Sequence, residues 1–253
     1  MTSISGKYII AVAIITTVSG CASVDVEKAA VEGGLPEKAK IIPTDIPTPI
    51  KTIEIYDAAK NKRVEADVLS LKSKEIRERL TSTETLVSIE KKDASGSLSY
   101  LGAGGKVAKG SYRVTFDYAN YTTQNVTFNA DKSAALGMIG VGLRITADLE
   151  TTENGVDLGG LLPIGFAAQN SKVSGRLGFR VYGMSNDKVA LAVPSNAILD
   201  VTSIQQSFES AAAVRVLFGL EDTKLEPYLI GVAGIQPLDA KNALEAATQK
   251  LTK

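Results

Sequence analysis

Apolar and polar residues alternate strictly in two segments of the chain, which is the pattern of half-buried β-strands. These segments are residues 112–118 and residues 173–182. Successive side chains of a strand point to opposite faces, so each segment predicts a strand with one face toward a core. After the first segment, Ala119-Asn120 predicts a turn, and Val126 and Phe128 predict the returning strand of a hairpin.

Shorter patterns predict the other elements. Strands are predicted over residues 53–57, 64–68, 188–193 and 225–233, and an Asn154-Gly155 hairpin turn leads toward residues 156–168. Helices are predicted over residues 73–80, 202–219 and 239–251. The last two helices have apolar stripes, formed by Ile204, Phe208, Ala211 and Ala212 in one and by Ala240, Leu244, Ala247 and Leu251 in the other.

Taken in chain order, these elements predict a mainly β, α+β protein. Residues 51–131 are expected to form a small β-sandwich. Residues 132–253 are expected to form an α+β domain, in which an antiparallel sheet precedes two C-terminal helices. Residues 22–50 contain Gly33-Gly34 and four prolines without a sustained apolar period, which predicts a semi-rigid extended tether.

The first residues have the composition of an export signal. Lys7 precedes an apolar run over residues 8–18, which is too short to span a bilayer as a helix. The sequence Val18-Ser19-Gly20-Cys21 resembles the lipobox of bacterial lipoproteins, in which the Cys is lipidated and becomes the new N-terminus. The resemblance implies a signal peptide over residues 1–20 and a lipidated Cys21, followed by the tether up to residue 50.

The residue after Cys21 bears on which membrane holds the anchor. In Gram-negative lipoproteins an Asp at this position usually signals retention in the inner membrane, and this chain has Ala22. The resemblance therefore implies anchoring to the cell outer membrane, facing the periplasm, or to the cell membrane if the host lacks an outer membrane. Lipidation also accounts for the cysteine count, since Cys21 is the only Cys of the chain.

Residues 51–131 carry a second resemblance. An opening strand that ends in Asp57, the Val64–Val68 strand, and Lys109-Gly110-Ser111-Tyr112 with a later Asn120-Tyr121 pair resemble carboxypeptidase-regulatory and PEGA-type β-sandwich modules. The resemblance implies an accessory or adhesion-like domain without an active site. For residues 132–253 no family resemblance is identified.

Composition excludes several classes of function. The chain has no His, so Ser-His-Asp and Cys-His hydrolases and imidazole metal sites are absent. It has 28 basic and 28 acidic side chains and no Trp, so neither a basic patch nor stacking platforms predict nucleic-acid binding.

Two glycine-rich segments and one acidic segment do not match known site motifs. Gly102–Lys106 lacks the Walker pattern, and Gly137, Gly140 and Gly142 fit a buried strand with close packing better than a dinucleotide site. The acidic residues Asp148, Glu150, Glu153 and Asp157 do not have the spacing of an EF-hand. We therefore predict no catalytic residue, no metal and no cofactor.

These observations predict a non-enzymatic structural or protein-binding component of the cell envelope, for example a subunit of a secretion or surface-appendage assembly. Its partners would be the membrane, through the N-terminal lipid, and an envelope protein or further copies of itself. The candidate protein-binding residues are Arg176, Arg180 and Tyr182, which alternate with the core face of one strand. The alternatives are an ordinary solvated sheet face at these residues, and a cell-wall polymer hydrolase that uses paired carboxylates.

Overall fold

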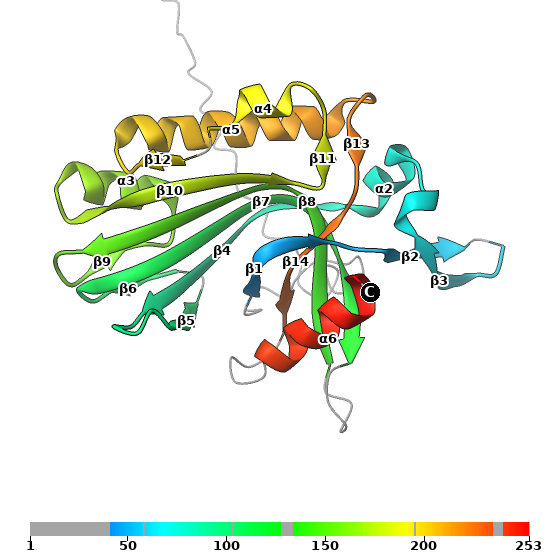
Figure 1. Ribbon diagram of the computed structural model, residues 1–253, viewed down its shortest axis with the longest axis horizontal. Helices are drawn as coiled ribbons and strands as arrows, with labels where there is room; N and C mark the ends of the chain where they lie inside the picture. Colours follow the sequence, from blue (N-terminus) through cyan, green and yellow to red (C-terminus); the bar gives the residue numbers. More distant parts are fainter. Residues whose placement is uncertain are drawn as a thin grey trace, which may run out of the picture.

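The computed structural model describes residues 41–57, 59–102, 104–127, 134–194, 196–234 and 240–252 (Figure 1). Cys21, the predicted signal peptide and Phe128 lie outside these ranges. The described chain is mainly β with helices added, so the predicted α+β class is confirmed. Among the described residues, no helix is both long enough and apolar enough to cross a membrane.

The first half of the chain consists mostly of strands, which are β1 (Ile41–Pro49), β2 (Thr52–Asp57), β3 (Lys62–Asp67), β4 (Ser82–Lys92), β5 (Leu98–Gly102), β6 (Lys106–Val107) and β7 (Gly110–Thr127). A 3-10 turn, η1 (Val68–Ser70), and helix α2 (Ser73–Arg79) lie between β3 and β4. The β2–β3 hairpin and α2 agree with the predicted elements.

The second half alternates strands with helices. Its strands are β8 (Ala134–Thr151), β9 (Val156–Asp157), β10 (Val173–Tyr182), β11 (Met184–Ser185), β12 (Asn196–Ile198), β13 (Lys224–Leu225) and β14 (Tyr228–Ala233). Its helices are α3 (Leu161–Gln169), α4 (Val189–Ala192), α5 (Val201–Gly219) and α6 (Ala240–Thr252). Strand β10 has the predicted bounds.

One antiparallel sheet of eight strands organises the molecule. Its order is β1-β14-β8-β7-β4-β5, and β10, with β12 on its outer side, also pairs with β8. Strand β8 changes partner along its length, because it pairs with β14 up to Gly140 and with β10 from Gly142 onward. Figure 1 shows the long strands β7 and β8 turning within the sheet.

Glycines allow the close approach of β7 and β8 at this change of partner. A Cβ atom at Gly142 would lie 2.1 Å from the carbonyl oxygen of Tyr118, and one at Gly140 would lie 2.7 Å from that of Asn120. No side chain fits at such distances. The expectation that these glycines belong to a closely packed buried strand is confirmed.

Two expectations about the first half need correction. Strand β7 does not turn at Ala119-Asn120 but continues to Thr127, because Asn120 keeps its place opposite Val141 of β8. The end of the predicted tether, Ile41–Pro49, is strand β1, which pairs with β14. Its prolines are tolerated because β1 is an edge strand and needs donors on one side only.

The predicted division at residues 131 and 132 does not separate two sheets. Strand β7 lies before this boundary and β8 after it, and the two strands pair continuously from Gly110 opposite Thr151 to Thr127 opposite Ala134. The described parts of the two predicted domains therefore share one sheet. Hydrophobic patterning shows where strands lie, but it does not show which strands pair.

Two corrections concern the second half. Residues 189–192 form a short helix, α4, in place of the predicted strand. After the turn at Gly155, whose φ is +83°, residues 161–169 form helix α3, and the short strand β9 pairs with β6. Both segments are short and apolar, and such runs suit a buried helix as well as a buried strand.

Helices cover one face of the sheet. Helix α5 packs on the second half of β8, and α3 packs on β10 and on α5, around a cluster that includes Phe116, Leu143, Ile145 and Leu177. Helix α6 packs on the first half of β8, against a cluster that includes Ile139 and Val232. The other face has a small apolar cluster around Met138 and Tyr121, and polar side chains beyond it.

Candidate functional site

The predicted binding residues of β10 share one face of the sheet, opposite its core-facing residues, but they differ in burial. Arg176 and Arg180 are exposed. Tyr182 is only 2% exposed, and its ring lies 6.3 Å from that of Tyr228. The expectation of three exposed side chains is therefore corrected to two arginines, because β1 and β14 cover the end of β10 that carries Tyr182.

Beside Arg180 lies a cavity of about 200 Å³ between β1, β8 and β10. Its floor contains the buried Arg144, whose Nε and Nη2 donate to the two carboxylate oxygens of Asp117 at 2.9 and 2.7 Å. The same guanidinium also donates to the carbonyl oxygens of Ile230 and Thr44.

This buried ion pair holds the sheet together. Burial raises the pKa of the Asp117 carboxyl, and the Arg144 guanidinium opposes that rise. Because the donors of Arg144 are directed to β7, β14 and β1, we interpret the pair as a clamp that fixes β1 across the polar face.

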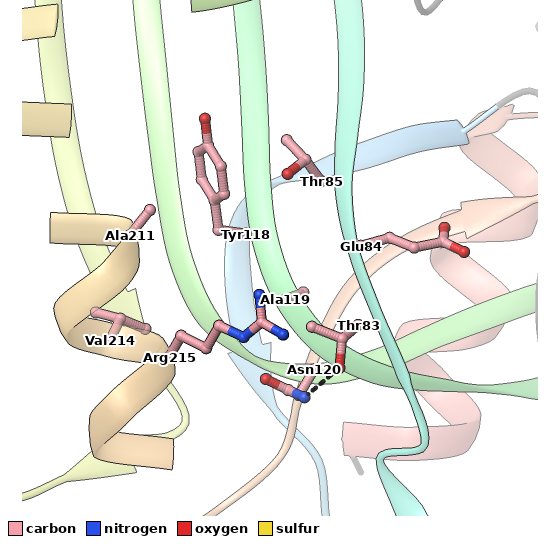
Figure 2. A pocket seen from close by; sticks show the side chains of 9 residues that line it. All are labelled: Thr83, Glu84, Thr85, Tyr118, Ala119, Asn120, Ala211, Val214 and Arg215. Atoms are coloured by element: carbon pink, nitrogen blue, oxygen red, sulfur yellow. Dashed lines mark hydrogen bonds between the residues drawn. The ribbon is translucent and has the colours of Figure 1, made fainter. Parts of the chain in front are cut away.

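A second pocket lies on the helix-covered face, where α5 leaves the edge of β4 and β7 open (Figure 2). It has a volume of about 170 Å³. Its lining residues are Thr83, Glu84 and Thr85 of β4, Tyr118, Ala119 and Asn120 of β7, and Ala211, Val214 and Arg215 of α5.

Strand alternation decides which polar groups point into this pocket. Thr83, Thr85, Tyr118 and Asn120 lie on the face of the sheet that α5 covers, because Thr83 is opposite Asn120 and Thr85 is opposite Tyr118. Glu84 points the other way, and its Oε2 accepts a hydrogen bond of 3.0 Å from the Tyr121 hydroxyl.

The pocket contains one cation and several neutral donors. Figure 2 shows the Arg215 guanidinium extending from α5 toward Asn120. Asn120 donates from Nδ2 to Thr83 Oγ1 at 2.7 Å, whereas Arg215 has no hydrogen-bond or ion-pair partner among the described residues. Burial raises the pKa of the Tyr118 hydroxyl to about 12, so it is protonated and can donate at neutral pH.

No residue of this pocket is among the binding residues predicted from the sequence. Thr83, Tyr118 and Arg215 come together only because β4 pairs with β7 and α5 crosses the same face. One signal was available, since Glu209 and Arg215 are the only charged residues in the 19 residues of α5.

The acidic residues considered for metal or hydrolytic chemistry are separately engaged. Asp148 pairs with Arg113 at 3.0 Å, Glu150 accepts from Ser111, and Glu153 pairs with Lys172 at 2.6 Å. Asp157 accepts from the backbone of Gly159. The described residues include no group of three or more acidic or Cys residues placed to hold a metal ion.

Comparisons with known proteins add no relative. No protein-family model matches the chain, and neither a curated protein nor a solved structure matches it.

Proposed function

We propose that this protein is a lipid-anchored component of the cell envelope whose folded body binds another envelope protein. In this proposal Cys21 carries the lipid that holds the chain to the outer membrane, on the periplasmic side. The anchor is supported by the lipobox resemblance of Val18-Ser19-Gly20-Cys21. The binding role is supported by the exposed surface of the helices.

One observation carries the binding role: the large exposed apolar side chains are concentrated on the helix-covered side of the molecule. Of those in the described chain, more than half lie on the helices α3, α4 and α5, namely Leu162, Phe166, Leu191, Val201, Phe208 and Val216. Neither α3 nor α4 contains a charged residue. Clustered apolar surface with few charges is typical of the centre of a protein interface.

Helix α5 has an unusual distribution of residues between its two sides. It buries Ser203, Ser207 and Ser210 together with Ile204, Val214 and Leu217, whereas Val201 and Val216 are 56% and 65% exposed. A helix that served only the fold would place most of its large apolar residues inward and polar residues outward. The outward apolar residues of α5 therefore favour contact with a partner.

The two exposed arginines of β10 are a second proposed contact surface. Replacing both, as Arg176→Ala with Arg180→Ala, should weaken partner binding by about 2 kcal/mol if they are interface anchors. The thermal stability of the double variant should stay close to that of the unchanged protein. Unaltered binding by a folded double variant would remove this face from the proposal.

Replacing Cys21 tests the anchor. We expect Cys21→Ser to move the protein from the membrane fraction to the soluble fraction, because acyl chains supply the attachment. Metabolic labelling with a fatty-acid analogue should mark the unchanged protein and not the variant. A variant that still sediments with membranes after a high-salt wash would contradict lipid anchoring.

Site-specific photo-crosslinking in intact cells tests the binding role. A photoreactive residue at Val216 or Leu191 should yield a discrete crosslinked species, and one at Glu65, exposed on β3, should not. If the two helical positions give no more crosslinked product than Glu65, the helix-covered side is not a partner surface.

A further inference from the structure

We infer that helix α5 binds α5 of a second copy of this chain, with the two helices antiparallel and related by a two-fold axis beside Ala212. The inference rests on the proposed function, because it names the partner of the same exposed surface. It is carried by the pattern of residues on the outer side of α5.

The outer side of α5 has the residue spacing of a helix that packs on another helix. Its exposed residues recur three or four positions apart, and they are Val201, Gln205, Phe208, Ala212 and Val216. Residues at this spacing lie along one side of a helix, and such a row forms the contact surface of paired helices. Val201, Phe208 and Val216 are large and apolar, so covering this row would be favourable.

The middle of this row is small. Ala212 is exposed there, and its side chain lets a second helix approach to the lower end of the usual separation of about 8–10 Å between packed helices. The buried residues Ser203, Ser207 and Ser210 lie on the opposite side of α5. The outer row is therefore separate from the contacts that α5 makes with the core.

The residues on either side of Ala212 match each other. Glu209 precedes Ala212 by three residues and Arg215 follows it by three, and these two are the only charged residues of α5. Phe208 precedes Ala212 by four residues and Val216 follows it by four. The row is therefore self-complementary about its middle, in charge and in apolar surface.

An antiparallel pair converts this symmetry into contacts. A two-fold axis beside Ala212 puts each residue level with the residue of the second copy that lies equally far on the other side of Ala212. Glu209 of each copy is then level with Arg215 of the other, and Phe208 is level with Val216. An in-register parallel pair would instead place Glu209 level with Glu209 and Arg215 level with Arg215. The charges therefore favour the antiparallel arrangement.

Both charged side chains are accessible for this contact. Glu209 Oε1 accepts a hydrogen bond of 2.8 Å from Gln205, which leaves Oε2 for a second donor. Arg215 is exposed, and Figure 2 shows its guanidinium projecting from α5. Charges at the rim of an apolar contact determine register and choice of partner more than affinity. A different protein would need a positive charge level with Glu209 and a negative charge level with Arg215, whereas a second copy of this chain already has both.

Sedimentation equilibrium of the purified full-length protein, in a detergent matched in density to the buffer, measures self-association. We expect a dimer with a Kd in the micromolar range. Glu209→Arg and Arg215→Glu each place like charges level with one another, so each variant alone should dimerise at least ten-fold more weakly. Glu65→Arg, at an exposed position of β3, is the matched control and should dimerise like the unchanged protein. Thermal unfolding followed by circular dichroism checks that the variants are folded.

A mixture of the two variants tests the antiparallel register. In a dimer of Glu209→Arg with Arg215→Glu, the introduced arginine is level with the introduced glutamate, and the native Arg215 is level with the native Glu209. The mixture should therefore associate about as tightly as the unchanged protein. A monomeric unchanged protein, or a mixture that associates no better than the single variants, would overturn the inference.

Crosslinking at Val216 in intact cells separates this inference from the proposed function. A crosslinked species with the mass of two copies supports both. A species that contains a different protein, together with a monomer in sedimentation, supports the proposed function and overturns the inference. Sedimentation uses purified protein, so its result does not depend on the membrane anchor or on the crosslinking experiment.

Discussion

Helices α5 and α6 cover neighbouring parts of the same sheet face, but they differ in the polar residues that they bury and in the apolar residues that they expose. Helix α6 buries Ala243, Ala247 and Leu251 completely, and its charged residues face solvent. Helix α5 buries three serines among its inward residues and exposes Val201 and Val216.

Helix α6 therefore mainly completes the core, whereas α5 also presents large apolar side chains on its outer side. The inward serines of α5 are small and buried, and Ser207 satisfies its hydroxyl by donating to the Ser203 carbonyl at 2.7 Å. The inward side of α5 also buries Ile204, Val214 and Leu217, so both helices contribute apolar side chains to the core. The outward apolar residues Val201 and Val216 are exposed and do not pack in the core.

The largest expected effect is at the core of α6. Leu251→Ala should lower the free energy of unfolding by about 2–5 kcal/mol, because it removes a fully buried side chain and leaves a cavity. Urea unfolding followed by circular dichroism measures this loss. Leu244→Ala, at a partly buried position of the same helix, is the control and should cost less. A loss below about 1 kcal/mol at Leu251 would show that α6 contributes little to the core.

A smaller effect is expected at the start of α5. Asp200 accepts a hydrogen bond of 2.7 Å from the Ser203 amide. The Asp200 side chain is exposed, so its contribution to stability does not include the apolar burial that stabilises α6. Asp200→Ala should therefore cost about 1 kcal/mol, the usual value of an N-cap. Asp222→Ala, an exposed position after the helix, should change stability by less than about 0.5 kcal/mol. Equal effects of the two substitutions would mean that the cap does not hold α5.

The smallest effect on stability is expected on the outer side of α5. Val216→Ser should change the free energy of unfolding by less than about 0.5 kcal/mol, because the side chain is 65% exposed. The same substitution should reduce the yield of crosslinks from Leu191 in intact cells. A loss of about 2 kcal/mol or more would place Val216 in the fold and would remove the distinction between the two helices.

Some elements of the fold could be predicted from local pattern alone. Strand β10 has strict alternation over ten residues, and the buried positions of α6 recur with helical spacing, so both were located correctly. The continuation of β7 past Ala119-Asn120 could not be predicted, because these residue types usually favour turns. Pairing with β8 and the hydrogen bond from Asn120 to Thr83 override that preference.

The pockets depended on pairings that local pattern does not contain. The predicted face of β10 was identified correctly, but the burial of Tyr182 follows from β1 and β14 crossing that end of the strand. The α5 pocket needs Thr83 and Tyr118 on adjacent strands and Arg215 from a distant helix. The sheet order and the crossing of α5, rather than any spacing along the chain, put these residues together.

The pairing of β1 with β14 has a consequence for the order in which the protein can be made. Ile41 lies opposite Ala233, so the first described strand finds its place only after nearly all of the chain has been synthesised. Until then β1 is an unpaired strand, and such strands are prone to pair with other chains. Pro43, Pro47 and Pro49 lack the amide hydrogens that such pairing would use. The prolines that weaken β1 as a strand therefore also limit its pairing with other chains before β14 has been synthesised.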